Sequence, residues 1–380
     1  MDQANWSFPT DIRFGCGRML EVKQCCDELN IHKPLIVTDK KLVSTKLFSK
    51  FRDNLFGAGI NFNIFSNVDA NPNERNLIHG LARLKSARSD GIIAFGGGSA
   101  IDLGKLLSFM SVQTRPVWDF EDRNDWWKRA SKVKTLPVIA LPTTAGTGSE
   151  VGRASVLTDT KNLTKKIIFH PSILPNIVIL DPELTVSMPA KITAGTGMDA
   201  FAHNLEAYCS KKLHPMSHGI ALEGMKMTMV NLPNCYKCPE DLKSRGQMLI
   251  CATMGAVAFQ KGLGAIHALS HPIGAKYNSH HGTINAILIN PVLNLNKSAA
   301  EEKILAACRY LNFEASYETF IKKIDELNSL VNIPKSLSSI GFKTEDTEEI
   351  IKNALNDPST QTNPVPLTKN NLERVLREAF

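Results

Sequence analysis

The chain has 380 residues, of which 43% are hydrophobic and 21% are charged, and Lys and Arg outnumber Asp and Glu by 44 to 37. This length predicts two or three domains with a substantial core, and the composition excludes an intrinsically disordered, collagen-like or disulfide-framed protein. The net charge of +7 is modest and its basic residues are scattered, so we expect no nucleic-acid partner.

The first half of the chain alternates between short apolar runs and segments with helical spacing. Strands are expected at residues 34–40, 61–65, 91–95, 137–144 and 177–182, and helices at 42–55, 73–87 and 100–110. This alternation predicts a parallel, Rossmann-like sheet with crossover helices. From about residue 189 the chain is rich in Ala, Leu, Met and Glu, and helices are expected at 194–212, 220–231, 299–310, 317–331 and 345–355. We therefore expect an α/β domain over residues 1–185 and an all-α domain over residues 186–380.

The sequence gives no sign of a membrane segment or of disulfides. The apolar charge-free runs at residues 246–260 and 262–275 are shorter than the roughly 20 apolar residues that a membrane helix needs. The N-terminus lacks the basic start and apolar run of a signal peptide. Among eight Cys, Cys25 and Cys26 are adjacent, which does not suit a framework of bridges. We expect a cytoplasmic protein with reduced thiols and no membrane contact.

A glycine-rich motif, FGGGSAIDLGK at residues 95–105, follows a predicted strand and opens a predicted helix. Its three glycines leave no Cβ to obstruct a phosphate, and the N–H groups at the start of the helix face an anion. The motif departs from the GxGxxG dinucleotide fingerprint. A glycine-rich turn without a ligand is the alternative interpretation.

Two further features fit a dinucleotide. The segment PTTAGTGSEV at residues 142–151 gathers hydroxyl groups and bare backbone after a strand, although an ordinary polar loop has the same composition. Asp39 ends the first long apolar run, where a carboxylate can accept both hydroxyls of an adenosine ribose and favour NAD over NADP. The alternative is a solvent-facing turn residue. Asp39 precedes the glycine motif by about 60 residues, whereas a standard Rossmann fold has this residue about 20 after it.

A group of His and Asp residues in the second half indicates a metal site. Two pairs are spaced four residues apart, so each pair shares one face of a helix, and two adjacent His follow; these are Asp199 with His203, His267 with His271, and His280 with His281. Three imidazoles and one carboxylate suit Fe²⁺ or Zn²⁺. A single His on an apolar face is usually a core residue, but this repeated spacing favours a metal.

At these four features the sequence resembles the iron-dependent (group III) alcohol dehydrogenase family. The match extends from FGCG at residues 14–17 to ILINPVL at residues 287–293, and its most specific parts are GGGSAIDLGK, PTTAGTGSEV, GMDAFAHNLEAY and GLGAIHALSHPIGAKYNSHHGTINA. The resemblance implies an NAD-binding α/β domain, an all-helical domain that binds metal and carries catalysis, and a cleft between them.

The resemblance also implies roles for individual residues. The metal ligands would be Asp199, His203, His267 and His281, and His271 would relay a proton without ligating. The residues implied for the cofactor are Asp39 and Asn71 near the adenosine, Gly97, Gly98, Ser99 and Asp102 at the pyrophosphate, Thr143, Thr144, Thr147 and Ser149 along the cofactor, and Lys165 at a ribose.

The sequence departs from the family pattern at two places. His280 stands where family members commonly have Pro, so either His280 or His281 could ligate, although the HG pairing favours His281. Gly152 and Arg153 follow the SEV segment, where a Thr is frequent at the first position. Because of the second departure, at Gly152 and Arg153, the resemblance does not indicate which substrate the protein uses.

The reaction implied by the resemblance is hydride transfer between NAD(H) and a small primary alcohol or its aldehyde, catalysed by a metal-dependent homodimer with Fe²⁺ or, in its place, Zn²⁺. One alternative is an NAD- and metal-dependent lyase of the dehydroquinate synthase type, although the DxxxH, HxxxH and HHG spacing favours the dehydrogenase. The other is a non-catalytic protein that binds metal or nucleotide. The sequence does not identify the alcohol.

Overall fold

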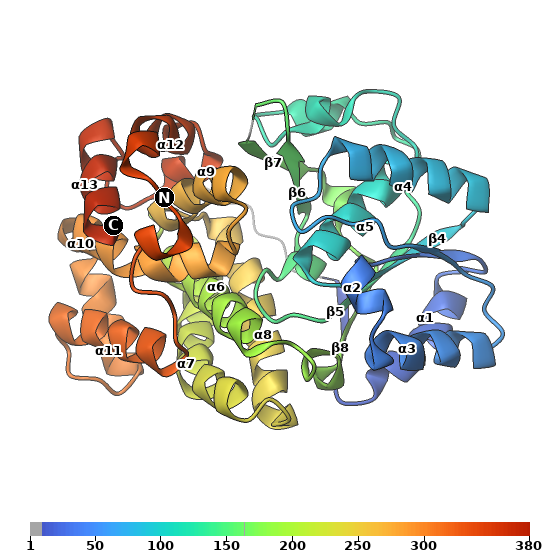
Figure 1. The fold of residues 1–380 in the computed structure, drawn as a ribbon, viewed down its shortest axis with the longest axis horizontal. Helices are drawn as coiled ribbons and strands as arrows, with labels where there is room; N and C mark the ends of the chain where they lie inside the picture. The colour runs from blue at the N-terminus through green and yellow to red at the C-terminus, as the bar shows by residue number, and fades with distance from the viewer. Residues whose placement is uncertain (1–9, 163) are drawn as a thin grey trace. The chain divides into compact units, whose positions relative to one another are not determined.

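The computed structural model describes residues 10–162 and 164–380. By the density of internal contacts, this part of the chain divides into two compact units, which Figure 1 draws in blue to green and in green to red. The α/β unit comprises residues 10–144 and 148–188, and the helical unit comprises residues 145–147 and 189–380. The predicted fold class, a parallel α/β unit followed by a helical one, is confirmed. The assignment of residues 1–185 and 186–380 to two functional domains stays a prediction.

The α/β unit is built on a six-stranded sheet with the order β1-β8-β5-β4-β2-β3, in which every neighbouring pair is parallel. The strands are β1 (Asp11–Phe14), β2 (Pro34–Val37), β3 (Asn63–Phe65), β4 (Gly91–Gly96), β5 (Val138–Pro142) and β8 (Ile177–Leu180). The central strands read as continuous apolar runs because helices cover both faces of the sheet. β1 is a strand that the sequence analysis missed.

Helices pack on both faces of this sheet, and the side chains of β4 alternate between the two cores. Ile92 points into a core with Leu103 and Leu107, while Phe95 points into a core with Phe48 and Phe51. The helices are α1 (Val22–Glu28), α2 (Lys40–Val43), α3 (Lys46–Gly57), α4 (Glu74–Ala87) and α5 (Gly98–Met110). Short 3-10 helices lie at Arg18–Glu21, Val117–Phe120, Trp126–Arg129, Ser149–Val151, Pro171–Ile173 and Pro182–Thr185.

A separate antiparallel pair of strands, β6 (Ala154–Asp159) and β7 (Thr164–Phe169), follows the PTTAGTGSEV segment. The residues of β6 alternate between intermediate and buried, which is the pattern of a strand with one covered face. This pair was not predicted from the sequence. Its register places Lys165 opposite Thr158.

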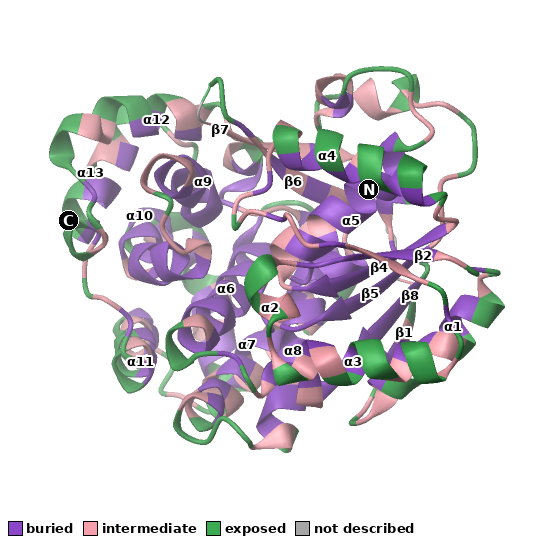
Figure 2. Cartoon of the chain, turned by 45° about the vertical axis from the view of Figure 1, so that its right-hand side comes forward, coloured by how far each residue is buried: buried purple, intermediate pink, exposed green. Residues whose placement is uncertain are grey.

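The helical unit is organised around α6 (Ala190–Cys209), which is buried from Thr193 to Cys209 and which Figure 2 shows as a purple ribbon. Small residues such as Gly197 and Ala200 let neighbouring helices approach it from several sides. The other helices are α7 (Pro215–Lys237), α8 (Leu242–Ala258), α9 (Ala265–Tyr277), α10 (His281–Tyr310), α11 (Tyr317–Leu330), α12 (Thr347–Leu355) and α13 (Lys369–Ala379). Further 3-10 helices lie at Phe259–Lys261, Ser338–Ile340, Thr344–Asp346 and Pro358–Thr362.

Two features of α9 and α10 matter for the site. α9 ends at Asn278, whose φ of 48° is the left-handed conformation that commonly terminates a helix. α10 then begins at His281, so the segment 299–310 predicted as a helix is only the last part of a much longer one. None of the helices in the described part of the chain is long and apolar enough to span a membrane alone; Leu242–Lys261 and Ala265–Tyr277 meet that test only together, across a bend of 110°.

Candidate dinucleotide site and metal centre

The direction of the chain through the sheet reverses between β2 and β4. From β2 the chain forms the edge strand β3 and then returns across β2 to form β4. Ligands of α/β sheets bind at the carboxyl ends of strands where the order reverses in this way. The reversal explains the unusual sequence order noted above. Asp39 follows β2 and the glycine motif follows β4, and these two strands are paired, with Val37 opposite Ala94.

The glycine motif forms the turn from β4 into α5. Gly96 has a φ of 153°, and a Cβ at this position would lie 2.8 Å from the Cβ of Ala100, so a side chain is excluded. Gly97 is the N-cap of α5 and Gly98 is its first residue. The first N–H groups of a helix have no intrahelical acceptor, and a phosphate binds well at such a position. The turn therefore has the shape and polarity of a pyrophosphate site.

Asp39 and Ser99 have structural contacts beside their implied roles at the cofactor. Asp39 caps α2, and its Oδ1 accepts hydrogen bonds from the backbone N–H groups of Lys41 and Leu42, both at 2.9 Å. The Ser99 hydroxyl donates to the Ala70 carbonyl at 2.6 Å. This bond holds the segment that contains Asn71 beside the start of α5.

Thr143 and Thr144 lie against the glycine turn. The Thr143 N–H donates to the Gly96 carbonyl at 2.9 Å. A Cβ at Gly97 would lie 3.3 Å from Cγ2 of Thr144, which shows how closely the two loops approach. The carboxyl ends of β4 and β5 thus bring the two predicted cofactor motifs together.

Thr147 belongs to a different part of the molecule from the other implied cofactor residues. Together with Ala145 and Gly146, it groups with the helical unit. A Cβ at Gly146 would lie 2.7 Å from the Cβ and from the carbonyl oxygen of Thr196, so this tripeptide packs tightly against α6. No feature of the sequence indicates this division within one motif.

Asp102 holds the loop that follows the PTTAGTGSEV segment. Its carboxylate accepts hydrogen bonds from the Ser149 hydroxyl and, at 3.0 Å, from the Val156 N–H. Lys105, whose side chain is fully buried, donates to the carbonyl and hydroxyl oxygens of Ser149 at 2.7 and 2.9 Å, and to the Ala154 carbonyl. Burial lowers the pKa of Lys105, and Asp102 opposes that shift. Lys105 therefore ties α5 to this loop, a role that sequence reasoning missed.

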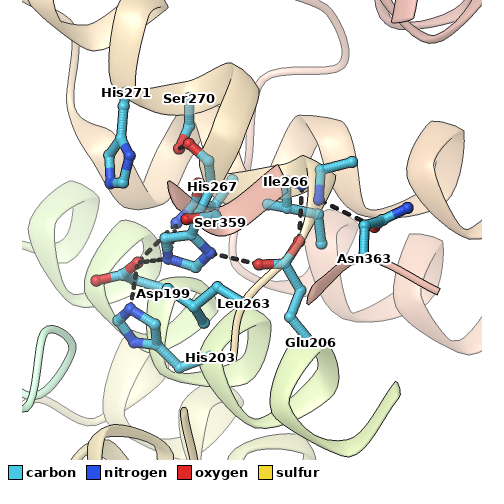
Figure 3. A network of polar contacts seen from close by, with 12 residues as sticks. Asp199, His203, Glu206, Leu263, Ile266, His267, Ser270, His271, Ser359 and Asn363 are labelled. Carbon is cyan, nitrogen blue, oxygen red and sulfur yellow. Dashed lines mark hydrogen bonds and ion pairs between the residues drawn. The ribbon is translucent and has the colours of Figure 1, made fainter. Parts of the chain in front are cut away.

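Three helices bring the predicted metal ligands together. Oδ1 of Asp199 lies 3.9 Å from Nε2 of His203 on the same helix, 3.8 Å from Nε2 of His267 on α9 and 3.6 Å from Nε2 of His281 on α10. Ligand atoms about 2.1 Å from a common tetrahedral ion would lie about 3.4 Å apart. Asp199, His203 and His267 are all buried, and Figure 3 shows these three side chains turned toward one another. This donor set fits Fe²⁺ or Zn²⁺.

Glu206 orients His267 from the side opposite to Asp199. Its Oε2 lies 2.6 Å from Nδ1 of His267, and its Oε1 accepts the Ile266 N–H at 2.7 Å (Figure 3). A proton held on Nδ1 leaves the lone pair of Nε2 directed at Asp199, which is the usual arrangement behind a metal-bound imidazole. Glu206 lies three residues after His203, so this partner could have been found from helical spacing alone.

The charges in this cluster shift the pKa values of its members. Burial alone would lower the pKa of His267, but Glu206 and Asp199 outweigh burial and raise it to about 9. Burial lowers the pKa of His203 to about 4, with partial opposition from Asp199. Burial alone would raise the pKa of Asp199, but His203 and the other imidazoles lower it strongly. Asp199 is therefore ionised at neutral pH.

His271 lies beside this cluster, and a carboxylate from a distant part of the chain orients it. Its ring stacks on that of His281 with centroids 5.3 Å apart, and its Nδ1 lies 2.7 Å from Oδ2 of Asp357. The Asp357 side chain is almost fully buried and caps the short helix Pro358–Thr362 by accepting a hydrogen bond from the Ser359 N–H. Burial alone would raise the pKa of Asp357, but His271 lowers it. The sequence carried no local signal for this partner, which is 86 residues away.

Comparisons with known proteins identify the family of this chain. The models of iron-containing alcohol dehydrogenase and of the C-terminal domain of that family match residues 9–182 and 193–380. The chain is 33% identical to alcohol dehydrogenase 4 of Saccharomyces cerevisiae (strain YJM789), over 97% of this chain and 96% of the relative. It is 32% identical to the NAD-dependent methanol dehydrogenase of Bacillus methanolicus, over 99% of this chain and 100% of the relative.

Among solved structures, a 1,3-propanediol oxidoreductase superposes with a TM-score of 0.94 and 30% identity, over 100% of both chains. The chain belongs to the iron-containing alcohol dehydrogenase family. As a member, it is an NAD-dependent alcohol oxidoreductase, which transfers a hydride between NAD(H) and an alcohol–aldehyde pair and uses a metal. This family match does not favour the lyase alternative.

The two departures of this alcohol dehydrogenase from its family pattern have different surroundings. His281 lies beside Asp199, whereas the His280 ring packs on Gly195, where a Cβ would lie 2.5 Å from Nδ1 of His280. The geometry thus groups His281, and not His280, with the other predicted ligands. The Arg153 guanidinium lies over the Phe169 ring, with 5.6 Å between its central carbon and the ring centroid.

Proposed function

We propose that this family member is an Fe²⁺-dependent dehydrogenase of small primary alcohols. The observation that carries the proposal is the close grouping of Asp199, His203 and His267, with Nε2 of His281 3.6 Å from Oδ1 of Asp199 and with Glu206 behind His267. Two relatives whose names specify methanol and 1,3-propanediol support a small substrate with a terminal hydroxyl group. Zn²⁺ is the alternative ion, since imidazole and carboxylate suit both.

In this proposal the four side chains of the cluster would hold the ion. When bound, the divalent cation supplies a Lewis acid that stabilises negative charge on the substrate oxygen, and NAD supplies the hydride acceptor. Ionised Asp199 contributes the negative charge of the site, and Glu206 keeps the His267 imidazole in the tautomer whose Nε2 can ligate.

His271 would pass the proton of the alcohol toward solvent. Oδ2 of Asp357 accepts a hydrogen bond from Nδ1–H of His271, so the lone pair of Nε2 remains available to take up the proton of the alcohol. Asp357 would thus be a positioning residue for His271. On the α/β unit, the glycine turn at Gly97 and Gly98 would hold the pyrophosphate, and Asp39 would hold the adenosine ribose.

Three further expectations accompany the proposal. The protein acts as a homodimer, it works in the cytoplasm, and its partner is a small alcohol or aldehyde. The first two would be checked by the molecular mass in solution and by fractionation of the source cells.

The decisive experiment is an anaerobic substrate panel. Metal-stripped protein is reloaded with Fe²⁺ or Zn²⁺ alone and assayed with NAD and primary alcohols of increasing length. Steady accumulation of NADH that depends on Fe²⁺ and is strongest with short alcohols supports the proposal. NAD that binds and is recycled without net NADH would support the lyase alternative, and tight NAD binding without turnover would support a non-catalytic role.

A further inference from the structure

Asn285 lies one turn into α10, directly behind His281, and its side chain is completely buried among the predicted metal ligands. Its amide nitrogen Nδ2 donates a hydrogen bond to Oδ1 of Asp199 at 2.7 Å. The same nitrogen lies 3.3 Å from Nε2 of His267 and 3.2 Å from Nε2 of His281. A single donor group therefore faces three of the four ligand atoms.

The protonation of the ring nitrogens fits this arrangement. Nδ1 of His267 faces the Glu206 carboxylate, and Nδ1 of His281 lies 3.3 Å from the Ser270 hydroxyl, which donates its own proton to the His267 carbonyl. When both rings are neutral, Nε2 is therefore the atom left to accept. An amide N–H carries a partial positive charge, and the lone pairs directed at it are those that would coordinate a cation. A cation and the Asn285 amide consequently compete for the same atoms.

The other end of the amide is poorly satisfied. Oδ1 of Asn285 is buried without a hydrogen-bond partner, although a buried carbonyl oxygen normally has one. Packing and backbone bonding therefore do not explain why an amide stands here. The contacts of Nδ2 with Asp199, His267 and His281 therefore set the orientation of this side chain.

We propose that Asn285 is a positioning residue that stands in for the metal ion. Its amide keeps the carboxylate and the two imidazoles turned inward whenever the ion is away, and it gives up its contacts with His267 and His281 when the ion binds. Because the amide stabilises the metal-free protein, it weakens metal affinity and eases exchange of the ion. The proposal rests on the metal site of the proposed function and adds a residue to it.

The test uses Asn285→Leu, which keeps the approximate volume of the side chain and removes the donor. The melting temperature of the stripped protein should fall by several degrees while that of the loaded protein changes little. The dissociation constants for Co²⁺ and Zn²⁺, measured by competition with a chelator, should fall by about tenfold relative to the unsubstituted protein. Weaker metal binding, or an equal loss of melting temperature in both forms, would overturn the proposal.

Asn296→Leu is the matched control. Asn296 is also buried on α10, but in the described part of the chain its hydrogen bonds go to Asn363 and Val365 and to none of the predicted ligands. Its substitution should lower both melting temperatures equally and leave metal affinity unchanged.

Two further measurements separate the possible failures. If the leucine variant does not fold, a crystal structure of the loaded, unsubstituted protein decides, because Nδ2 of Asn285 must then have left Nε2 of His267 and of His281. If the ion binds there with these contacts intact, the proposal fails while the metal site stands. If removing His267 leaves the metal content unchanged, the metal site itself fails, and the role of Asn285 fails with it.

Discussion

The two units build their candidate sites from different parts of the polypeptide. In the α/β unit, the glycine turn presents backbone N–H groups, and its shape depends on the absence of side chains at Gly96 and Gly97. In the helical unit, the site consists of side chains from three helices, and His267 and His271 each depend on a buried carboxylate elsewhere. A site made of backbone tolerates changes of single side chains, whereas a site made of side chains fails when one is removed.

The largest expected effect tests this contrast directly. His267→Ala should remove the metal and abolish turnover, because the remaining ligands hold a labile ion poorly. Elemental analysis would measure the metal, and NAD affinity measured by fluorescence should change by less than about twofold because the α/β unit is intact. His218→Ala, on α7 and stacked on Tyr208, is the control that should retain its metal. Full metal content in the His267 variant would refute its assignment as a ligand.

Removing the proton relay should have the next largest effect. His271→Ala should leave the metal bound and slow turnover by ~10²–10⁴-fold, the usual scale for a positioned acid or base. Asp357→Asn should slow turnover less, by roughly 10-fold to 100-fold, since the imidazole remains but its orientation is less well fixed. Both variants would be assayed for metal content and for kcat. Loss of metal from the His271 variant would make it a ligand instead.

Lower pH should weaken metal binding, whereas the glycine turn, which presents backbone groups, should be unaffected. Because the pKa of His267 is raised to about 9, a second proton on this ring competes below that pH with both the ion and the Asn285 amide for Nε2. Metal affinity should therefore rise about tenfold per pH unit between pH 6 and 8, and more slowly near pH 9. His203, whose pKa is lowered to about 4, contributes nothing in this range. Calorimetry in buffers of different ionisation heats would count the released proton, and an affinity independent of pH would contradict this expectation.

The smallest effect is expected at Asp39. Asp39→Asn removes the charge but retains an oxygen that can cap α2, so the fold should lose little stability. The preference for NAD over NADP should fall by about tenfold, because a carboxylate no longer repels the 2′-phosphate. The ratio of kcat/KM for the two cofactors is the measurement. An unchanged ratio would show that Asp39 serves only as the cap.

The same contrast explains what the sequence could predict. The glycine turn, Asp39 and the paired spacing of Asp199 with His203 lie within short motifs, so local patterns were enough to propose them as site residues. The antiparallel pair β6–β7 was missed because β7 carries Lys165 and Lys166 in place of an apolar run. Strand β1 was missed because it has only four residues, two of them charged.

Of the residues that contact the imidazoles, some could be predicted from local spacing and others could not. Glu206 was accessible from helical spacing, since it follows His203 by one turn. Asp357 and Asn285 were not, because their contacts depend on how distant helices and loops pack, and no periodicity in the sequence encodes this. Residues that position the side chains of a site therefore have to be identified from the three-dimensional structure.

The tripeptide 145–147 has a practical consequence for the expression of either half of the protein as a separate fragment. A fragment that stops at residue 188 carries Gly146 without Thr196, against which it packs, and a fragment that starts at residue 189 lacks the glycine whose backbone helps to set the pKa of His203. Neither half is therefore a complete folding unit. A chimaera made by exchanging halves between relatives should take residues 145–147 from the same parent as residues 189–380.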